Sequence, residues 1–272
     1  MRIAVVAPSS RFSEAAAARV TEIAARRFPD VELFFHPQCF LTHNHFAGTD
    51  AARAAALVEV GNDPGFDAIW FARGGYGACR VAEDVLAALG PAARRKAWLG
   101  YSDAGYLLAG LYKAGFGDLA HGPMAQCAMH EGGEAAVARA LGWLTRREAG
   151  ALEPHLALGD THAAFNLTVF SQLLGTALEP DLTDHVLLLE EVSEQMYRVD
   201  RSFGHITGQP SVRRVAGIRL GRVSAVPPND PAFGEDEVMV ARHWCERAGI
   251  AFLGRADIGH DSANKVVPFG RF

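Results

Sequence analysis

The first half of the chain alternates short apolar runs with helical stretches, and this pattern constrains the fold most. Helices are expected from Ser13, which can cap the first, to Arg27, from Thr49 or Asp50 to Val60, and over Ala78–Leu89, Ala104–Ala114 and Glu134–Thr145. Runs that end at turns predict strands at Arg2–Ala7, Val31–Phe35, Asp67–Phe71 and Lys96–Leu99. Strands that alternate with helices at this spacing favour an α/β fold with a parallel, doubly wound sheet.

The second half is less regular and follows a segment without periodicity. Residues Arg146–Gly159 mix charges, Gly and Pro, which predicts a linker between a domain at 1–148 and one at 149–272. Beyond it, helices are expected at Asn166–Leu174 and Glu235–Ala248, and strands at Val186–Leu189, Val215–Leu220, Ile250–Leu253 and Val266–Val267. The length of 272 residues allows either one large domain or two small ones.

Composition and charge exclude several classes of function. Hydrophobic residues make up 49% of the chain, enough for a substantial core, and the net charge of −5 argues against a nucleic-acid partner. The basic pair Arg213-Arg214 and the run at 94–96 are short and read as solvated surface. The N-terminus has one positive charge and a brief apolar run before Pro8, and no later run has transmembrane length. We therefore expect a cytoplasmic protein with no membrane partner.

Cysteine and histidine spacing does not indicate a disulfide framework or a metal site. The four cysteines, Cys39, Cys79, Cys127 and Cys245, are far apart and form no CxxC pair. Metal-ligating side chains gather at His36, Cys39, His43 and His45, but their loop-like context imposes no ligand geometry. A surface loop is favoured over a metal site there, and no cofactor is expected.

A glycine-rich loop follows the expected strand that ends at Phe71. Arg73-Gly74-Gly75-Tyr76-Gly77 would let the backbone approach a ligand closely and turn its N–H groups toward an anion. The pattern is not G-x-G-x-x-G, so a dinucleotide site has weak support. An ordinary tight turn remains the alternative.

Ser102 lies on a second loop, between an expected strand and an apolar helix. Gly100 precedes it by two residues and Ala104 follows by two, as in the nucleophile elbow of serine hydrolases. Amides at the start of the helix would then face a developing oxyanion. The alternative is that Ser102 or Asp103 only caps the helix.

A nucleophilic serine also needs a base and an orienting carboxylate. Glu190 and Glu191 end an apolar strand, and His260 lies in a loop after another strand. Strand-exit charges and a surface histidine are the plain alternatives, and spacing alone does not bring these residues together.

The chain resembles the LD-carboxypeptidase family of serine peptidases, which includes the microcin C self-immunity peptidases. The matching motifs run along nearly the whole chain in the family's order. They are Ala7-Pro8-Ser9, Phe46-Ala47-Gly48-Thr49-Asp50, Arg73-Gly74-Gly75-Tyr76-Gly77 with Arg80, Gly100-Tyr101-Ser102-Asp103, Gly122-Pro123-Met124, Asn166-Leu167, Gly175-Thr176, Leu189-Glu190-Glu191-Val192, Glu194, Tyr197-Arg198, Asp200-Arg201, Pro228-Asn229-Asp230 and Gly259-His260.

The resemblance implies a Rossmann-like N-terminal domain, a smaller β-rich C-terminal domain and, often, a homodimer. It implies a triad of Ser102, Glu190 and His260, with an oxyanion hole at the amides of Asp103 and Gly75. Gly74, Tyr76, Asn166 and Phe165 are the expected substrate-binding residues. The implied reaction releases a terminal D-amino acid from cytoplasmic murein tetrapeptides.

One departure from the family pattern leaves the substrate open. Ala164-Phe165 stands where the family usually has Gly-Gly. A detoxifying amidohydrolase of peptidyl or aminoacyl nucleotides is the first alternative, and an aromatic Phe165 or Trp98 facing the pocket would favour it. A non-catalytic muropeptide-binding protein is the second.

Overall fold

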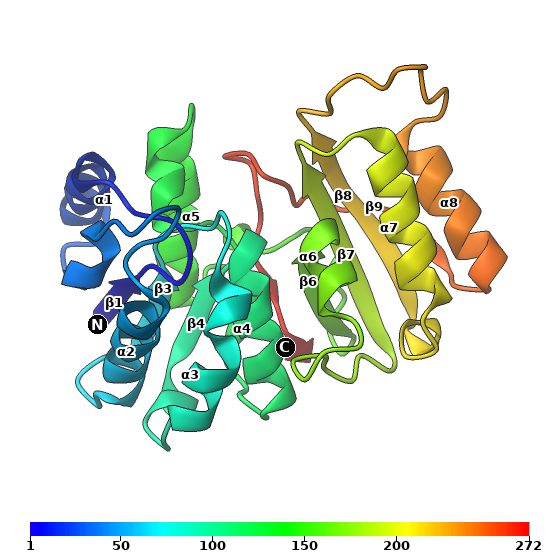
Figure 1. Cartoon of the computed structure of the whole chain (residues 1–272). Coiled ribbons are helices and arrows are strands. Elements are labelled where there is room, and N and C mark those ends of the chain that lie inside the picture. The colour runs from blue at the N-terminus through cyan, green and yellow to red at the C-terminus, as the bar shows by residue number, and fades with distance from the viewer. Residues whose placement is uncertain (272) are drawn as a thin grey trace.

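Two sheets, each covered by helices, lie side by side in the computed structural model, which describes residues 1–271 (Figure 1). The first sheet has the order β10-β5-β4-β3-β1-β2. All strands but one are parallel, and the exception, β10, pairs antiparallel with β5. The bounds are β1 (Arg2–Val6), β2 (Glu32–Phe35), β3 (Ala68–Phe71), β4 (Ala97–Gly100), β5 (Leu119–His121) and β10 (Val267–Pro268).

Helices cover both faces of the first sheet because its strands are apolar on both sides. In β1, Ile3 and Val5 pack toward α1 (Glu14–Arg27) and α5 (Gly133–Arg146). Ala4 and Val6 face the opposite core, with α2 (Asp50–Asn62), α3 (Ala82–Ala88) and α4 (Gly105–Lys113). Ser13 caps α1 and Thr49 caps α2, each accepting a backbone N–H. This doubly wound arrangement confirms the predicted fold class of the first half.

The second sheet has the order β11-β6-β7-β8-β9 and is parallel except for β11. Its strands are β6 (Thr161–Asn166), β7 (His185–Val192), β8 (Gly217–Ser224), β9 (Phe252–Arg255) and β11 (Gly270–Arg271). Helices α6 (Leu167–Leu173), α7 (Met196–Gly208) and α8 (Glu237–Ala248) accompany it. Gly204 lets α7 approach α8, because a Cβ there would lie 3.0 Å from the Trp244 ring.

The two sheets share one continuous core and are joined by the C-terminal segment. Phe165 and Val169 pack against Gly105, where an added Cβ would lie 3.1 Å from Val169. The last residues then place β10 in the first sheet and β11 in the second. The division into 1–148 and 149–272 stays a prediction, since a strand from the second range completes the first sheet.

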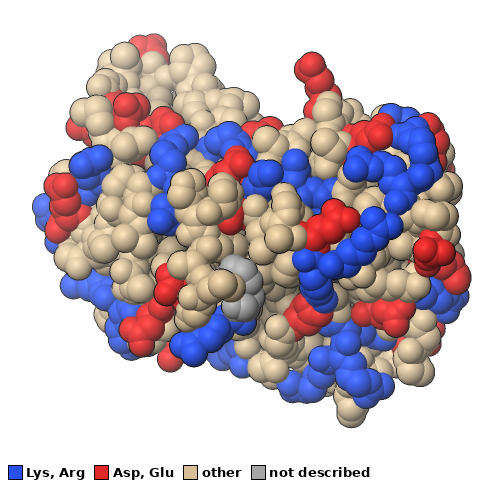
Figure 2. All heavy atoms as spheres, turned by 180° about the vertical axis from the view of Figure 1, so that it is seen from behind, with Lys and Arg blue, Asp and Glu red and all other residues tan. Residues whose placement is uncertain are grey.

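Some expected elements differ from those observed. The run Ala78–Leu89 is not one helix but a 3₁₀ turn (Ala78–Arg80) followed by α3, and strands β5, β6 and β11 were not predicted. The expected linker is partly fixed, because Glu153 is buried and its Oε1 accepts the Asp257 N–H at 2.9 Å. Within residues 1–271, no helix is long and apolar enough to cross a membrane. Seen from behind, acidic and basic side chains are interspersed over the surface (Figure 2).

Candidate active site

Ser102 lies at a sharp turn between β4 and α4. Its backbone adopts a left-handed conformation with φ 58°, unusual for a residue with a side chain. Gly100 permits the turn, because a Cβ there would lie 2.5 Å from the Phe71 ring. A short 3₁₀ turn (Ser102–Ala104) leads directly into α4. The local geometry is therefore that of a nucleophile elbow rather than a simple helix cap.

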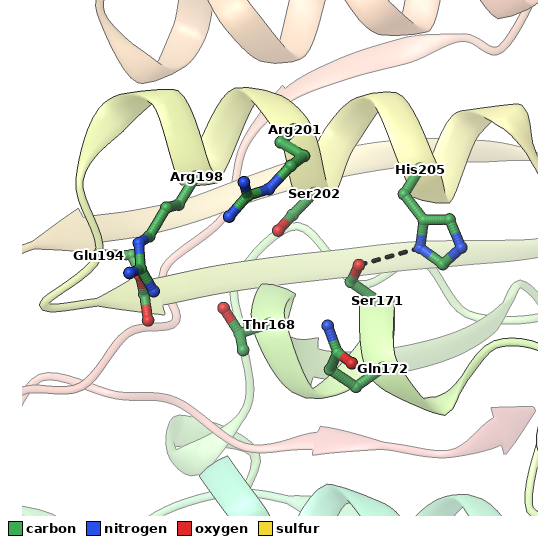
Figure 3. Close-up of a pocket in the computed structure, with 8 residues that line it drawn as sticks. All are labelled: Thr168, Ser171, Gln172, Glu194, Arg198, Arg201, Ser202 and His205. Carbon is green, nitrogen blue, oxygen red and sulfur yellow. Dashed lines mark hydrogen bonds and ion pairs between the residues drawn. The ribbon is translucent and has the colours of Figure 1, made fainter.

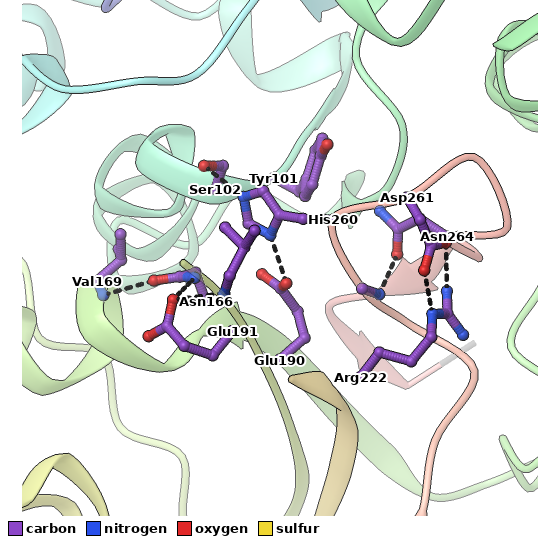
Figure 4. Close-up of polar contacts among 12 residues, drawn as sticks. Tyr101, Ser102, Asn166, Val169, Glu190, Glu191, Arg222, His260, Asp261 and Asn264 are labelled. Atoms are coloured by element: carbon purple, nitrogen blue, oxygen red, sulfur yellow. Dashed lines mark hydrogen bonds and ion pairs between the residues drawn. The ribbon is translucent and has the colours of Figure 1, made fainter. Parts of the chain in front are cut away.

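Ser102, His260 and Glu190 form a continuous chain of hydrogen bonds (Figure 4). The Ser102 Oγ lies 2.9 Å from His260 Nε2. On the other side of the ring, His260 Nδ1 lies 2.5 Å from Glu190 Oε2. The structure thus brings together three residues that are separated by up to 158 positions along the chain.

Glu190 reaches His260 from inside the protein. It lies near the end of β7 and is fully buried, with 0% of its surface exposed. Gly221 on the neighbouring strand β8 makes room for it, because a Cβ there would lie 2.8 Å from the Glu190 Cβ. A buried carboxylate needs a cationic or hydrogen-bonding partner, and His260 is that partner.

Glu191 points elsewhere and has a different set of partners. Its Oε1 accepts from Asn166 Nδ2 at 2.7 Å and from the Val192 N–H at 2.8 Å. Its Oε2 accepts from the Thr168 N–H at 2.9 Å and the Thr168 hydroxyl at 2.7 Å. Burial raises the pKa of Glu191 above its usual value, although these donors oppose that shift. Glu191 therefore ties β7 to the start of α6.

The loop that carries His260 is held by Arg222 of β8. Its guanidinium donates to Asp261 Oδ2 at 2.5 Å and Oδ1 at 2.9 Å, and to Asp257 Oδ1 at 2.5 Å. The Tyr101 ring packs 4.8 Å from the His260 ring, centroid to centroid. Burial alone would lower the pKa of His260, but the charge and hydrogen bond of Glu190 outweigh it, and the net shift is upward.

The glycine loop closes the site from the side of the first sheet. A Cβ at Gly74 would lie 3.0 Å from the Ser102 Oγ, so the backbone runs directly beside the Ser102 hydroxyl. Gly75 has φ 107°, and a Cβ there would lie 2.2 Å from the Ser10 Oγ. Gly75 therefore requires glycine, and a side chain at Gly74 would crowd Ser102. Asp103 turns its carboxylate inward, where Oδ2 accepts from the Ser9 hydroxyl and the Ala78 N–H.

A cavity of about 290 Å³ opens in front of Ser102. Of the predicted site residues, Gly75, Tyr76, Ser102, Asp103, Asn166 and His260 line it. The sequence did not predict the remaining walls: Tyr106, Thr168, Val169, Gln172, Glu191, Val192 and Glu194. Two signals could have found most of them: Tyr106 lies one helical turn after Ser102, and Glu191, Val192 and Glu194 belong to motifs of the family resemblance.

Of the predicted substrate-binding residues, neither Gly74 nor Phe165 lines the cavity. Phe165 lies in the core. It is 1% exposed and stacks on Phe170 at 4.9 Å between ring centroids. Trp98 is also buried, between Phe71 and Phe116. Because Phe165 fills space between the two sheets, its side chain adds to the core and leaves the pocket wall unchanged. Neither residue therefore forms the aromatic platform that would favour the nucleotide-peptide alternative.

His36 and Cys39, from the cluster weighed as a metal site, have other partners. His36 Nδ1 accepts the Gln38 N–H at 3.1 Å, and the buried Cys39 thiol donates to the Val5 carbonyl at 3.3 Å. Within residues 1–271, no group of three or more His, Cys, Asp or Glu is arranged to hold a metal. His121 is fully buried behind Tyr101, and burial lowers its pKa to about 4.

Sequence comparison assigns both halves of the chain to domains of one protein family. Residues 3–122 match the model of the LD-carboxypeptidase N-terminal domain, and residues 163–272 match that of the LD-carboxypeptidase C-terminal domain. The chain belongs to the LD-carboxypeptidase family. It is accordingly a serine-type peptidase.

Two relatives and two solved structures illustrate the similarity. A protein of Synechocystis sp. named as a carboxypeptidase is 34% identical over 84% of this chain and 77% of its own. The murein tetrapeptide carboxypeptidase of Pseudomonas aeruginosa is 26% identical over 99% of this chain and 91% of its own.

The solved structures share the fold at lower sequence identity. Muramoyltetrapeptide carboxypeptidase from Oxalobacter formigenes superposes with a TM-score of 0.83 at 22% identity, covering 99% of this chain and 93% of its own. The microcin C7 self-immunity protein MccF in complex with aspartyl sulfamoyl adenosine gives 0.81 at 19% identity, covering 99% and 91%.

Proposed function

We propose that Ser102 is the nucleophile, His260 the general base and Glu190 the residue that orients and charges His260. The hydrogen-bond chain from the Ser102 Oγ through His260 to Glu190 is the observation that carries this proposal. His260 would take the proton of Ser102 as the hydroxyl attacks the scissile carbonyl. It would then deliver that proton to the leaving amine, and water would release the acyl group by the same route.

The amides of Asp103 and Gly75 would stabilise the oxyanion. Asp103 directly follows Ser102 in the 3₁₀ turn that leads into α4, where N–H groups point out of the helix end. The inward carboxylate of Asp103 anchors this segment to Ser9 and Ala78, which supports a rigid donor. Gly75 lines the same cavity from the other side.

The relatives and the cavity support a substrate class. We infer release of a terminal D-alanine from murein tetrapeptides, and the similar Pseudomonas enzyme is named as a murein tetrapeptide carboxypeptidase. Gly74, Tyr76 and Asn166 would contact the peptide beside Ser102. A cytoplasmic setting accords with the free thiols of Cys39, Cys79, Cys127 and Cys245. The nucleotide-peptide alternative loses its motivating feature, because Phe165 and Trp98 are buried.

The test is mass spectrometry of purified protein incubated with a murein tetrapeptide. The expected result is a tripeptide and free D-alanine, with no product from Ser102→Ala. A fluorophosphonate should label the wild type at Ser102 and leave Ser102→Ala unlabelled. Labelling without hydrolysis of the tetrapeptide would contradict the substrate, whereas absence of both would favour a binding protein.

A further inference from the structure

A second histidine lies behind the proposed triad and has no part in the proposed chemistry. His121 ends β5 and is 1% exposed. Its ring packs 5.6 Å from the Tyr101 ring, centroid to centroid, and the other neighbour of Tyr101 is the His260 ring. His121 also pairs with Val267 of β10, the strand that follows the His260 loop. It is therefore fixed where the two sheets meet.

Glu190 approaches the same region from the second sheet. Side chains alternate along β7, so Glu190 lies on the same face as Leu188, and Leu188 packs in one cluster with Ala164 and Val267. Val267 is the strand partner of His121, and the Ala164 carbonyl accepts a hydrogen bond from the His121 ring. The buried carboxylate and the buried imidazole thus converge on one space inside the protein.

Three buried polar atoms in this space have no hydrogen-bond partner among residues 1–271. Glu190 binds His260 through Oε2, but its Oε1 is unpartnered, as are His121 Nε2 and Asn264 Nδ2. Asn264 belongs to the His260 loop (Figure 4), is fully buried beside the His121 ring, and uses its Oδ1 to accept the Gly259 N–H at 3.1 Å. An unpartnered carboxylate oxygen is costly to bury, so a donor is required there.

The three atoms cannot satisfy one another directly. Burial lowers the pKa of His121 to about 4, so the ring is neutral near pH 7. Because Nε2 has no partner, Nδ1 must donate to the Ala164 carbonyl, and Nε2 is then an acceptor. Two acceptors, on Glu190 and His121, therefore face one donor, on Asn264. A water molecule, which donates twice and accepts, matches this set.

Other histidines of the second half have evident partners. His205 Nδ1 lies 3.0 Å from the Ser171 hydroxyl, on the wall of a cavity of about 460 Å³ (Figure 3). His185, at the start of β7, accepts from the Tyr112 hydroxyl through Nε2 at 2.7 Å. The unpartnered Nε2 of His121 is thus a feature of its own site.

We propose that Glu190 Oε1, Asn264 Nδ2 and His121 Nε2 bind one internal water molecule, and that His121 is thereby a positioning residue for the triad carboxylate. The water accepts from Asn264 and donates to Glu190 and His121. Its hydrogen bond holds Oε1 in place and disperses part of the carboxylate charge, while Oε2 stays directed at His260. This inference rests on the proposed roles of Glu190 and His260.

A high-resolution crystal structure of the wild type tests the water itself, independently of catalysis. The expected result is a single peak of electron density within about 2.7–3.2 Å of all three atoms. A direct hydrogen bond between His121 and Glu190, or no density between the three atoms, would overturn the proposal.

His121→Phe tests the coupling to the triad, because phenylalanine keeps an aromatic ring but offers no acceptor. Without the donor that the water supplies, Glu190 becomes more basic and holds the proton of His260 more tightly. We expect the midpoint of the kcat/KM–pH profile to rise by about 0.5–1 pH unit and kcat to fall by roughly tenfold. His121→Gln, whose amide oxygen can accept near the Nε2 position, should retain most of the wild-type profile.

The other groups that set the charge state of His260 are the same in all these variants. The titratable and charged groups that act on His260 or pack around its loop are Glu190, Glu191, Asp261, Arg222 and Tyr101. A role of His121 in packing alone would change the melting temperature and leave the midpoint where it is.

His185→Phe is the matched control. It removes a buried histidine and its hydrogen bond from the opposite end of β7. It should lower the melting temperature without moving the midpoint or kcat.

An unchanged midpoint in His121→Phe, or an equal loss in His121→Gln, would overturn the inference and leave the proposed triad intact. Wild-type turnover in Glu190→Gln would instead refute the triad, and with it the positioning role of His121. If His121→Phe does not fold, His121→Gln and the electron density of the wild type still decide the proposal.

Discussion

The two sheets contribute to the site in different physical ways. The first supplies backbone geometry: Ser102 is in a left-handed conformation, and a Cβ at Gly74 would crowd its hydroxyl. The second supplies charge: Glu190 is fully buried against His260, and Arg222 holds the loop that carries His260. One side of the site therefore depends on conformational strain, and the other on electrostatics inside the protein.

This difference determines how each side responds to change. Holding a residue in a sparsely populated backbone region lowers the free energy of unfolding by about 1–3 kcal/mol at any pH, and the surrounding structure keeps the residue there. A buried ion pair responds strongly to pH and to removal of one partner, because the remaining charge is left without compensation. Substitutions on the two sides should thus be distinguishable by their pH dependence as well as by their size.

Ser102→Ala should have the largest effect, a loss of roughly 10⁴-fold or more in kcat, because it deletes the proposed nucleophile. The fold should remain, since the side chain lies at a cavity wall. Adding His260→Ala should cost little more, because members of a triad act as a unit. Turnover of the tetrapeptide measures both. Near wild-type turnover in the single variant would refute the assignment.

Glu190→Gln should come next, with a loss of roughly 10³–10⁴-fold in kcat through loss of tautomer control and of charge stabilisation on His260. Glu191→Gln is the matched control one residue away. It should cost about 1–3 kcal/mol in unfolding free energy, because Glu191 accepts four hydrogen bonds, but change kcat far less. Denaturant melts and kinetics of the pair distinguish them. The reverse pattern would move the carboxylate to Glu191.

The sequence pattern predicted the backbone side of the site better than the charged side. Gly100 and Ala104 around Ser102 indicate an elbow, since small neighbours are a local requirement that spacing records. Glu190 and Glu191 are equivalent by pattern, and only resemblance favoured Glu190. The structure separates them through β7, whose alternating faces send one side chain to His260 and the other to α6.

The failures also have physical causes. Strands β5 and β6 were missed because Leu119–His121 is very short and Thr161–Asn166 carries His, Thr and Asn in place of a clear apolar pattern. The sequence predicts Phe165 at the pocket because it replaces a glycine of the family pattern directly before Asn166. Packing between α4 and α6 decides its position, and such long-range packing leaves no local signature.

The pH dependence gives a smaller effect that belongs to the charged side alone. The proposed general base acts only when His260 is neutral, and Glu190 raises the pKa of His260 above the ordinary 6.5, so kcat/KM should rise with pH through this raised value. The contribution of the His260–Glu190 pair to stability has the opposite pH dependence. It is fully present below the pKa of His260 in the unfolded chain, and it is lost as the pH rises through the raised pKa of His260 in the folded protein.

An NMR titration of the His260 ring measures the shift directly. Glu190→Gln should lower the midpoint, because burial then acts without the opposing charge. Ser102→Ala serves as the control and should leave the midpoint nearly unchanged, since Ser102 carries no charge. An equal midpoint in wild type and Glu190→Gln would show that the carboxylate does not set the charge state of His260.

The smallest effect isolates the backbone strain at Ser102. Ser102→Gly and Ser102→Ala both remove the hydroxyl and its hydrogen bond to His260, so these losses cancel when the two variants are compared. Glycine adopts φ 58° without the cost of about 1–2 kcal/mol that a Cβ imposes in the left-handed region. Relative to alanine, however, glycine lowers the free energy of unfolding by about 0.5–1 kcal/mol, because the unfolded chain has more conformational freedom to lose at glycine. Ser102→Gly should therefore be the more stable variant by roughly 0.5–1 kcal/mol, or about 1–3 °C in melting temperature for a chain of this size.

Calorimetry at one pH resolves such a difference between the two variants. Because backbone strain does not titrate, the difference should persist from pH 5 to pH 9. A Ser102→Gly variant less stable than Ser102→Ala would mean that the elbow is held without strain, and that the contrast between the two sides of the site rests on charge alone.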